Sequence, residues 1–199
     1  MFRLAPQVLA VVAVSALGGC IMPYAIPPTR GEIGAATTTG DHAPAAHVAG
    51  GAHFASGTTG SQPTFDLGIG GFFDWNEQGT AARGVYTDAA VFVERHDSTR
   101  TSIGLRTELH LPVEMSGPGF GAKLRIDHEM FGSTSKGYSG SDRCGFIAGA
   151  AHGTAAVGFY AEAGPVRLPT TETAWTASAG LTLRLPSTMG IVFGIPGCH

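Results

Sequence analysis

The chain has 199 residues, which is the size of a single domain, and 30 of them are Gly, about twice the usual share of ~7%. Charged residues make up only 14%, and the net charge of −3 excludes the basic surface typical of nucleic-acid binders. We therefore predict no nucleic-acid partner, and a Gly-rich, Lys-poor chain favours a β-structure with tight packing or an apolar exterior.

Residues 1–19 have the physical parts of a signal peptide. Arg3 gives a short basic start, an apolar run extends from Leu4 to Leu17, and two glycines follow. The run is shorter than the roughly 20 residues that a transmembrane helix needs, and Pro6 interrupts its start. We therefore predict that residues 1–19 are a removable signal peptide.

Leu17-Gly18-Gly19-Cys20 resembles the lipobox of bacterial lipoproteins, with its elements in the expected order and spacing. The resemblance implies cleavage before Cys20, diacylglycerol on its thiol and acylation of the new amino group. Membrane lipid is then a partner through Cys20, and two or more acyl chains anchor a protein durably. Ile21 follows the cysteine where Asp commonly retains Gram-negative lipoproteins at the inner membrane, so the resemblance implies the outer membrane.

Residues 20–64 show no sustained apolar period and are rich in Pro, Thr, Gly and Ala. This composition buries too little apolar surface to offset chain entropy, so we predict a flexible tether. His42, His47 and His53 lie in it, but their spacing fits no tight ligand pattern and we predict no metal or cofactor. Residues 47–55 could instead form a weak extra strand.

From Phe65 onward the chain alternates between apolar and polar residues, which predicts strands. The strongest case is 120–130, where Leu124 and Ile126 share one face and Lys123 and Arg125 share the other. We predict an all-β fold for residues 65–199, an antiparallel barrel of about eight strands. The predicted strands are 65–75, 82–95, 101–113, 119–131, 144–152, 154–164, 173–185 and 188–195.

One arrangement of these strands is an outer-membrane barrel, with apolar side chains outward and polar side chains inward. The body is similar to small outer-membrane barrel proteins, although no motif carries the resemblance. Phe65 and Trp175 would lie at one rim and Trp75 and Phe120 at the other. Charges of both signs would pair inside the barrel: Arg106, Glu108, Lys123, Arg125, Asp127, Glu129, Glu162 and Arg184.

The alternative is a soluble β-barrel or β-sandwich in the periplasm that binds a small apolar ligand or an envelope partner, with the apolar face inside. Two observations favour it. The chain ends in Pro196-Gly197-Cys198-His199 rather than in an aromatic residue. The longer predicted connections also share an end with the N-terminus, where outer-membrane barrels keep short turns. The sequence leaves both arrangements open.

Cys144 and Cys198 remain after Cys20 is acylated, and an exported protein meets an oxidising compartment. We therefore predict a disulfide between Cys144 and Cys198. No catalytic motif stands out, so the sequence predicts a non-enzymatic, structural or envelope-associated lipoprotein whose protein partner, if it has one, is unidentified.

Overall fold

The computed structural model describes residues 20–39, 44–55, 64–77, 79–111, 117–142, 144–167 and 173–194. These residues form ten strands: β1 (Cys20–Ile26), β2 (Thr29–Thr38), β3 (Ala45–Ala55), β4 (Phe65–Asn76), β5 (Gly79–Arg95), β6 (Thr99–His110), β7 (Gly119–Asp142), β8 (Gly145–Arg167), β9 (Ala174–Leu185) and β10 (Ser187–Gly194). No helix in the described ranges is long and apolar enough to cross a membrane.

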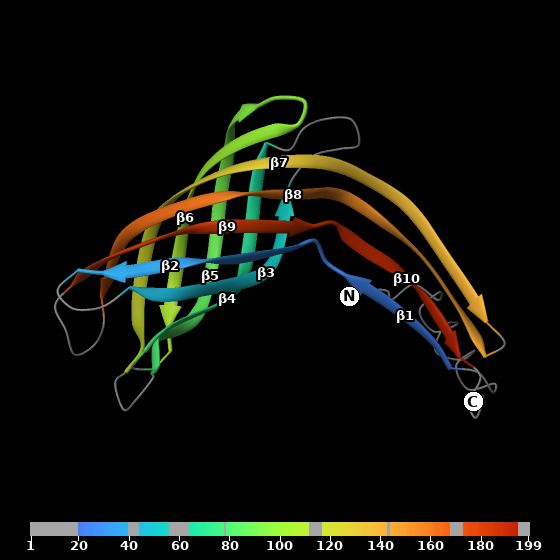
Figure 1. Cartoon of the computed structure of the whole chain (residues 1–199), viewed down its shortest axis with the longest axis horizontal. Coiled ribbons are helices and arrows are strands. Elements are labelled where there is room, and N and C mark those ends of the chain that lie inside the picture. Colours follow the sequence, from blue (N-terminus) through green and yellow to red (C-terminus); the bar gives the residue numbers. More distant parts are fainter. Residues whose placement is uncertain are drawn as a thin grey trace, which may run out of the picture. The chain divides into compact units, whose positions relative to one another are not determined.

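Strands β2 to β9 close into an antiparallel barrel (Figure 1). Consecutive strands pair in sequence order, and β9 pairs with both β8 and β2. The closing register runs from Thr29 opposite Leu185 to Thr38 opposite Thr176. Closure leaves these eight strands without an unpaired edge, which removes the hazard of edge-to-edge association. The predicted all-β barrel of about eight strands is confirmed.

The predicted tether is wrong, because β1, β2 and β3 lie within residues 20–64. Strands β2 and β3 belong to the barrel, which therefore begins at Thr29 and not at Phe65. The weak extra strand considered for 47–55 is real and corresponds to β3. Apart from Ile33 the outward side of β2 is built of Gly, Ala and Thr, so its hydropathy is low, and the ladders to β3 and β9 hold it in place.

Two predicted strands, 144–152 and 154–164, are one continuous strand, β8. Gly153 has a φ of +118°, a left-handed conformation that glycine adopts without strain. It lies between a segment that pairs with β10 and a segment that pairs with β9. The strand therefore continues through a glycine that the sequence suggested was a turn.

Merging these strands also changes the rim to which Trp175 belongs. Trp75 lies at the end of β4 and Phe120 at the start of β7, and Trp175 starts β9 at that same end of the barrel. The predicted grouping of Trp175 with Phe65 is therefore wrong. It rested on a strand count in which 144–152 and 154–164 ran in opposite directions.

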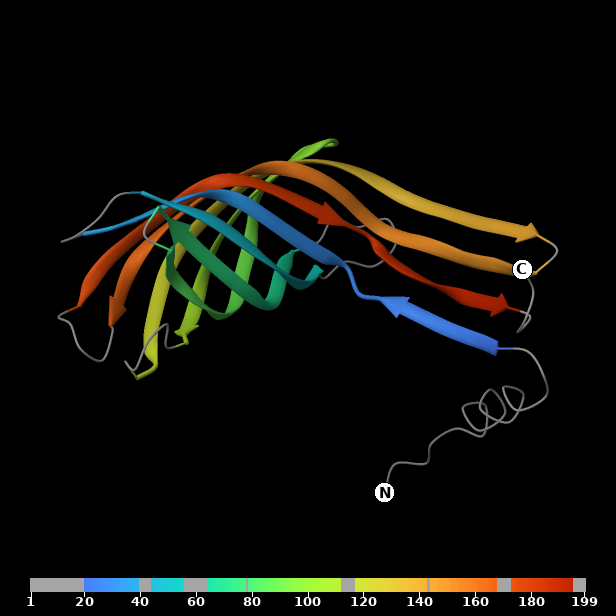
Figure 2. The same cartoon turned by 60° about the horizontal axis from the view of Figure 1, so that its bottom comes forward.

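The remaining described strands form a second compact unit, a four-stranded sheet in the order β1, β10, β8, β7 (Figure 2). This unit uses only residues 145–152 of β8 and the last part of β7. Cys20 pairs with Gly194, and Gly194 pairs with Gly145. The rings of Phe146 and Phe193 stack with their centroids 5.6 Å apart. The predicted strand 188–195 thus exists as β10, outside the barrel.

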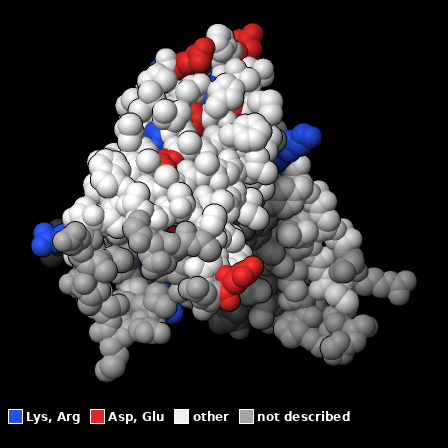
Figure 3. Space-filling model, turned by 60° about the vertical axis from the view of Figure 1, so that its left-hand side comes forward, with Lys and Arg blue, Asp and Glu red and all other residues white. Residues whose placement is uncertain are grey.

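The barrel has its charged side chains inside and its apolar side chains outside. Along β7, Lys123, Arg125 and Asp127 are buried, whereas Leu124 and Ile126 between them are exposed. Most of the described surface on the face in Figure 3 carries no charge, and the charged groups there are few and scattered. The inward and outward sets are the reverse of those in a water-soluble barrel.

Inward-facing glycines make room for large side chains from neighbouring strands. A Cβ atom on Gly68 would lie 2.3 Å from Cε1 of His53, and one on Gly70 would lie 2.6 Å from the Tyr86 hydroxyl. A residue larger than glycine at either position would therefore displace the ring of His53 or Tyr86. The high glycine content therefore matches an interior filled with rings and long charged side chains.

Candidate functional site: the charged barrel interior

The buried interior of the barrel is a cluster of ionisable side chains. Among the described residues, eight buried carboxylates and six buried cations leave a formal charge of −2, with His47, His53 and His110 counted as neutral. The carboxylates are Glu32, Asp66, Asp74, Asp88, Glu108, Asp127, Glu129 and Glu162, and the cations are Arg30, Arg100, Arg106, Lys123, Arg125 and Arg184. Burying a charged group is energetically costly unless the group is paired and hydrogen-bonded, so the partners of each group show whether the interior is stable without water.

Glu32 on β2 is the acceptor around which the cluster is organised. Arg106 on β6 donates two hydrogen bonds to its carboxylate, at 2.9 and 3.0 Å, and Arg125 on β7 donates a third at 3.0 Å. The Nε of Arg30 lies 3.2 Å from the same carboxylate. Three guanidinium groups from three different strands therefore converge on one carboxylate, which ties opposite walls of the barrel together.

Arg106 and Arg125 are each held by further acidic and aromatic partners. Arg106 donates to both carboxylate oxygens of Asp88, at 2.7 and 2.8 Å, and its guanidinium lies 4.1 Å from the centre of the Tyr86 ring. Arg125 donates to Glu162 at 2.9 Å and lies 4.4 Å from the centre of the Tyr160 ring. Such bidentate and stacked geometry suits Arg and not Lys.

Toward the end of the barrel where β2 begins, a second group of pairs continues the network. Arg100 donates to Glu129 at 2.8 Å, and Arg184 donates to Asp66 at 2.5 and 3.2 Å and to Glu129 at 3.3 Å. Phe92 covers the Arg100 guanidinium at 4.8 Å. Glu129 thus bridges two arginines from different strands.

Toward the other end the network includes the only buried lysine among the described residues. Lys123 lies 2.7 Å from Glu108 and 3.2 Å from Glu162. His110 contacts Glu108 at 3.0 Å, and His47 contacts Asp74 at 2.5 Å. Carboxylates at this end therefore have both permanent cations and histidines as partners.

The packing of these groups leaves the middle of the barrel filled. Arg106 has an exposed fraction of 0%, and the side chains of Glu32 and Glu162 also expose 0%. A water-filled channel would expose the residues that line it, as in wide porins. At the level of Arg106 the barrel is therefore closed by its own side chains and is not an open pore.

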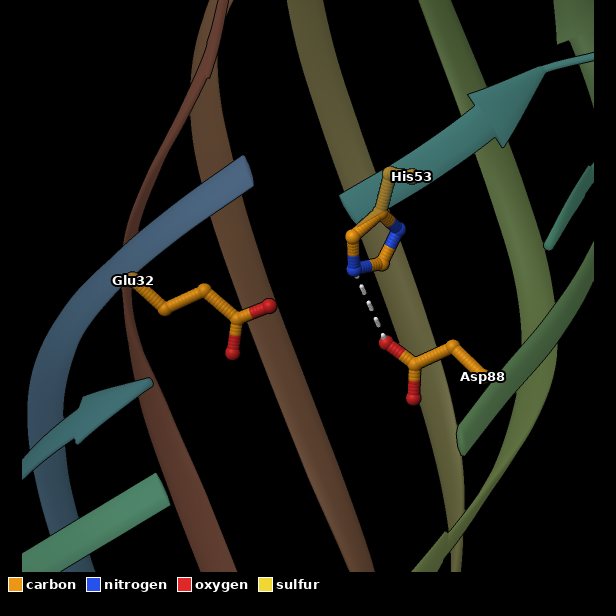
Figure 4. Close-up of side chains that lie close together, drawn as sticks. All are labelled: Glu32, His53 and Asp88. Carbon is orange, nitrogen blue, oxygen red and sulfur yellow. Dashed lines mark ion pairs between the residues drawn. The ribbon is translucent and has the colours of Figure 1, made fainter. Parts of the chain in front are cut away.

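Glu32, His53 and Asp88 form the one candidate metal-ligand cluster found among the described residues, with potential ligand atoms within 4.8 Å of one another (Figure 4). The Nε2 of His53 lies 3.7 Å from Asp88 and 3.3 Å from the Tyr86 hydroxyl. Arg106 already donates to both carboxylates. The positive charge that a metal ion would bring is therefore already supplied by a guanidinium, and the cluster is part of the ion-pair network.

All eight residues that the sequence placed inside the barrel are buried there. The sequence prediction missed Arg30, Glu32, His47 and His53, because they fall in the supposed tether. It also left five residues in or beside the predicted strands out of the interior: Asp66, Asp74, Asp88, Arg100 and His110. A usable signal was present, since Arg30 and Glu32 stand two residues apart between small or apolar neighbours. His42 lies outside the described residues.

The cysteine predictions fall largely outside what the structure describes. Residues 1–19 and Cys198 are not among the described residues, and Cys20 is the first residue of β1. Cys198 is outside the described residues, so the predicted disulfide between Cys144 and Cys198 stays a prediction.

At the exposed turn between β5 and β6, a small polar cluster lies outside the barrel interior. His96 contacts the Glu94 carboxylate at 3.1 Å, and the Thr101 hydroxyl donates to it at 3.2 Å. These hydrogen bonds lower the pKa of Glu94, and the one with His96 has the larger effect. The group is open to solvent and resembles an ordinary surface pair.

No protein-family model matches the chain, and comparison with curated proteins and with solved structures finds no match. The features that bear on function are therefore those of the barrel itself. Its two decisive features are a closed, ion-paired interior and an apolar outer wall.

Proposed function

We propose that this chain is a non-enzymatic lipoprotein of the outer membrane, anchored by lipid on Cys20, whose barrel crosses the bilayer as a closed structural element. The observation that carries the proposal is that the outer surface of the barrel is apolar. Outward side chains such as Leu124 and Phe159 are each 60% exposed, and similar residues surround the barrel. Soluble monomers rarely expose continuous apolar patches above a few hundred Å², whereas lipid requires such a surface.

Strand length and the rim residues support the same proposal. Strands β2, β3, β4, β6 and β9 have 10, 11, 12, 12 and 12 residues. A tilted strand needs about 9–11 residues to cross the hydrocarbon core of a bilayer. Trp75, Phe120 and Trp175 share one rim, where aromatic residues commonly mark a membrane interface.

The soluble alternative, a periplasmic barrel holding a small apolar ligand, needs its apolar face inside. The interior instead holds Arg106, Arg125 and Glu32. No cavity suited to an apolar ligand is compatible with that interior, so we do not favour this alternative.

The test is fractionation of cells that express the Cys20→Ala variant. Loss of the lipid should abolish labelling by radioactive palmitate, while the matched variant Cys144→Ala keeps the label. The Cys20→Ala protein should still resist alkaline extraction and show heat-modifiable gel migration, because the barrel holds it in the membrane. Release of the folded Cys20→Ala protein into buffer would refute a membrane-spanning barrel, and unchanged palmitate labelling would refute the lipid site.

A further inference from the structure

A groove of about 1020 Å³ lies in the outer wall of the barrel, across β7, β8, β9 and β2. Its floor is built from small outward-facing side chains in two cross-strand rows. In one row Ala161 pairs with Ala179, which pairs with Ala35. In the next row Ala163 pairs with Ala177.

Larger side chains bound this floor. Leu124 and Ile126 of β7 line one side, Pro44 lines the other, and Trp175 and Pro165 lie at the rim. Toward the middle of the barrel the next cross-strand row consists of exposed bulky residues, Phe159, Leu181 and Ile33. The groove is therefore a bounded depression that starts at the aromatic rim, and is not a general property of the wall.

The depth of the groove suits one leaflet of a bilayer. Its floor covers residues 161–165 of β8, about 13 Å along the strand, or about 10 Å along the bilayer normal at a tilt of about 40°, which fits within the roughly 15 Å of half the hydrocarbon core. Arg167 continues the outward-facing series of Ala163 and Pro165, and its side chain is exposed. An apolar groove with a cation at its mouth complements an acyl chain that ends in an anionic headgroup.

We propose that this groove binds one acyl chain of an anionic lipid, with Arg167 contacting the headgroup and the alanine floor accepting the chain. The inference rests on the proposed function, since the groove meets lipid only if the barrel is inserted. The chain offers an internal reporter, because its two tryptophans are Trp175 in the groove and Trp75 on β4 at the same rim.

The test uses the full chain folded into phosphatidylcholine vesicles that contain increasing fractions of phosphatidylglycerol with brominated acyl chains, which quench tryptophan fluorescence. The Trp75→Phe variant reports on Trp175, and the Trp175→Phe variant reports on Trp75. Half-maximal quenching of Trp175 should need about fivefold less brominated lipid than that of Trp75, the preference expected from one cation near an anionic headgroup.

In the Trp75→Phe background, Arg167→Gln and Ala163→Leu should each remove this preference. The matched variant Ala89→Leu, an exposed alanine on the outer side of β5, should leave it unchanged. Equal quenching of both tryptophans would refute the lipid site while leaving the inserted barrel intact. Absence of quenching at both would refute the proposed function itself. Quenching of Trp75 alone, with crosslinked dimers, would show that a second copy covers the groove and would overturn the inference.

Discussion

Replacing Arg106 with Met tests whether the interior network holds the barrel together. Arg106 is fully buried and donates four hydrogen bonds, two to Asp88 and two to Glu32. Methionine fills similar space but supplies no donor and no charge. The substitution leaves Asp88 without the arginine that donates to it, leaves Glu32 with Arg30 and Arg125 only, and changes the formal interior charge from −2 to −3.

Removing one partner of a buried ion pair typically costs about 3–5 kcal/mol, because the remaining charge stays away from water. We expect the free energy of unfolding of Arg106→Met to fall by about this amount. Arg106→Lys should lose less, since it keeps the charge but not the forked geometry. Adding Asp88→Asn to Arg106→Met should recover part of the loss, because one uncompensated charge is then removed.

The measurement is urea unfolding of the refolded protein in lipid vesicles, followed by tryptophan fluorescence and extrapolated to zero urea. Lys136→Met is the matched control, since Lys136 is exposed and its loss should change stability by less than about 0.5 kcal/mol. If Arg106→Met is within that range of the wild type, Arg106 is not needed to compensate the buried carboxylates, and the idea that it holds the barrel together is refuted.

Further predictions address the wall, the packing and the disulfide. Leu105 in the middle of β6 is 51% exposed. Leu105→Arg at the bilayer centre should lower the free energy of unfolding by about 2–4 kcal/mol, whereas Leu111→Arg near the interface should lower it by about 0–1 kcal/mol. Equal effects in the same urea assay would contradict an inserted barrel. Gly70→Val should destabilise by about 1–3 kcal/mol in that assay, because its side chain would clash with the Gly50 carbonyl oxygen and the Tyr86 ring, and an unchanged unfolding midpoint would argue against this packing. A nonreducing peptide map should join Cys144 to Cys198, and finding both thiols free would refute the pairing.

The parts of the fold that the sequence predicts are those in which large apolar residues alternate with charges. On β7 this alternation identifies Lys123, Arg125 and Asp127 as one face, and that face is the barrel interior. The pattern does not say which face meets water, because either orientation satisfies period two. Only the closure of the sheet decides it, and the charges turn out to be inside.

The least predictable residues are also the most central. Glu32 lies in a strand whose outward neighbours are mainly Gly, Ala and Thr, so the strand has little hydropathy of its own. It is held by pairing with β9, about 150 residues later in the chain, and that register is not encoded locally. Gly153 shows the same limit, since a glycine between two alternating segments predicts a turn as readily as a kink within one strand.

The corrected strand count changes one sequence-based objection to a membrane-spanning barrel but does not remove it. Strand β2 begins and β9 ends at the same end of the barrel, as Thr29 opposite Leu185 shows, so the eight strands return the chain to the side from which it came. The connections 111–118 and 168–173 join strands at the opposite end, where outer-membrane barrels carry their longer loops, but the longer connection 56–64 joins β3 and β4 at the end where β2 begins. Only two residues of chain separate β1, which begins at Cys20, from the first barrel strand. On the proposed function, the lipid on Cys20 is therefore a second anchor on a protein that the apolar wall of its barrel already holds in the membrane.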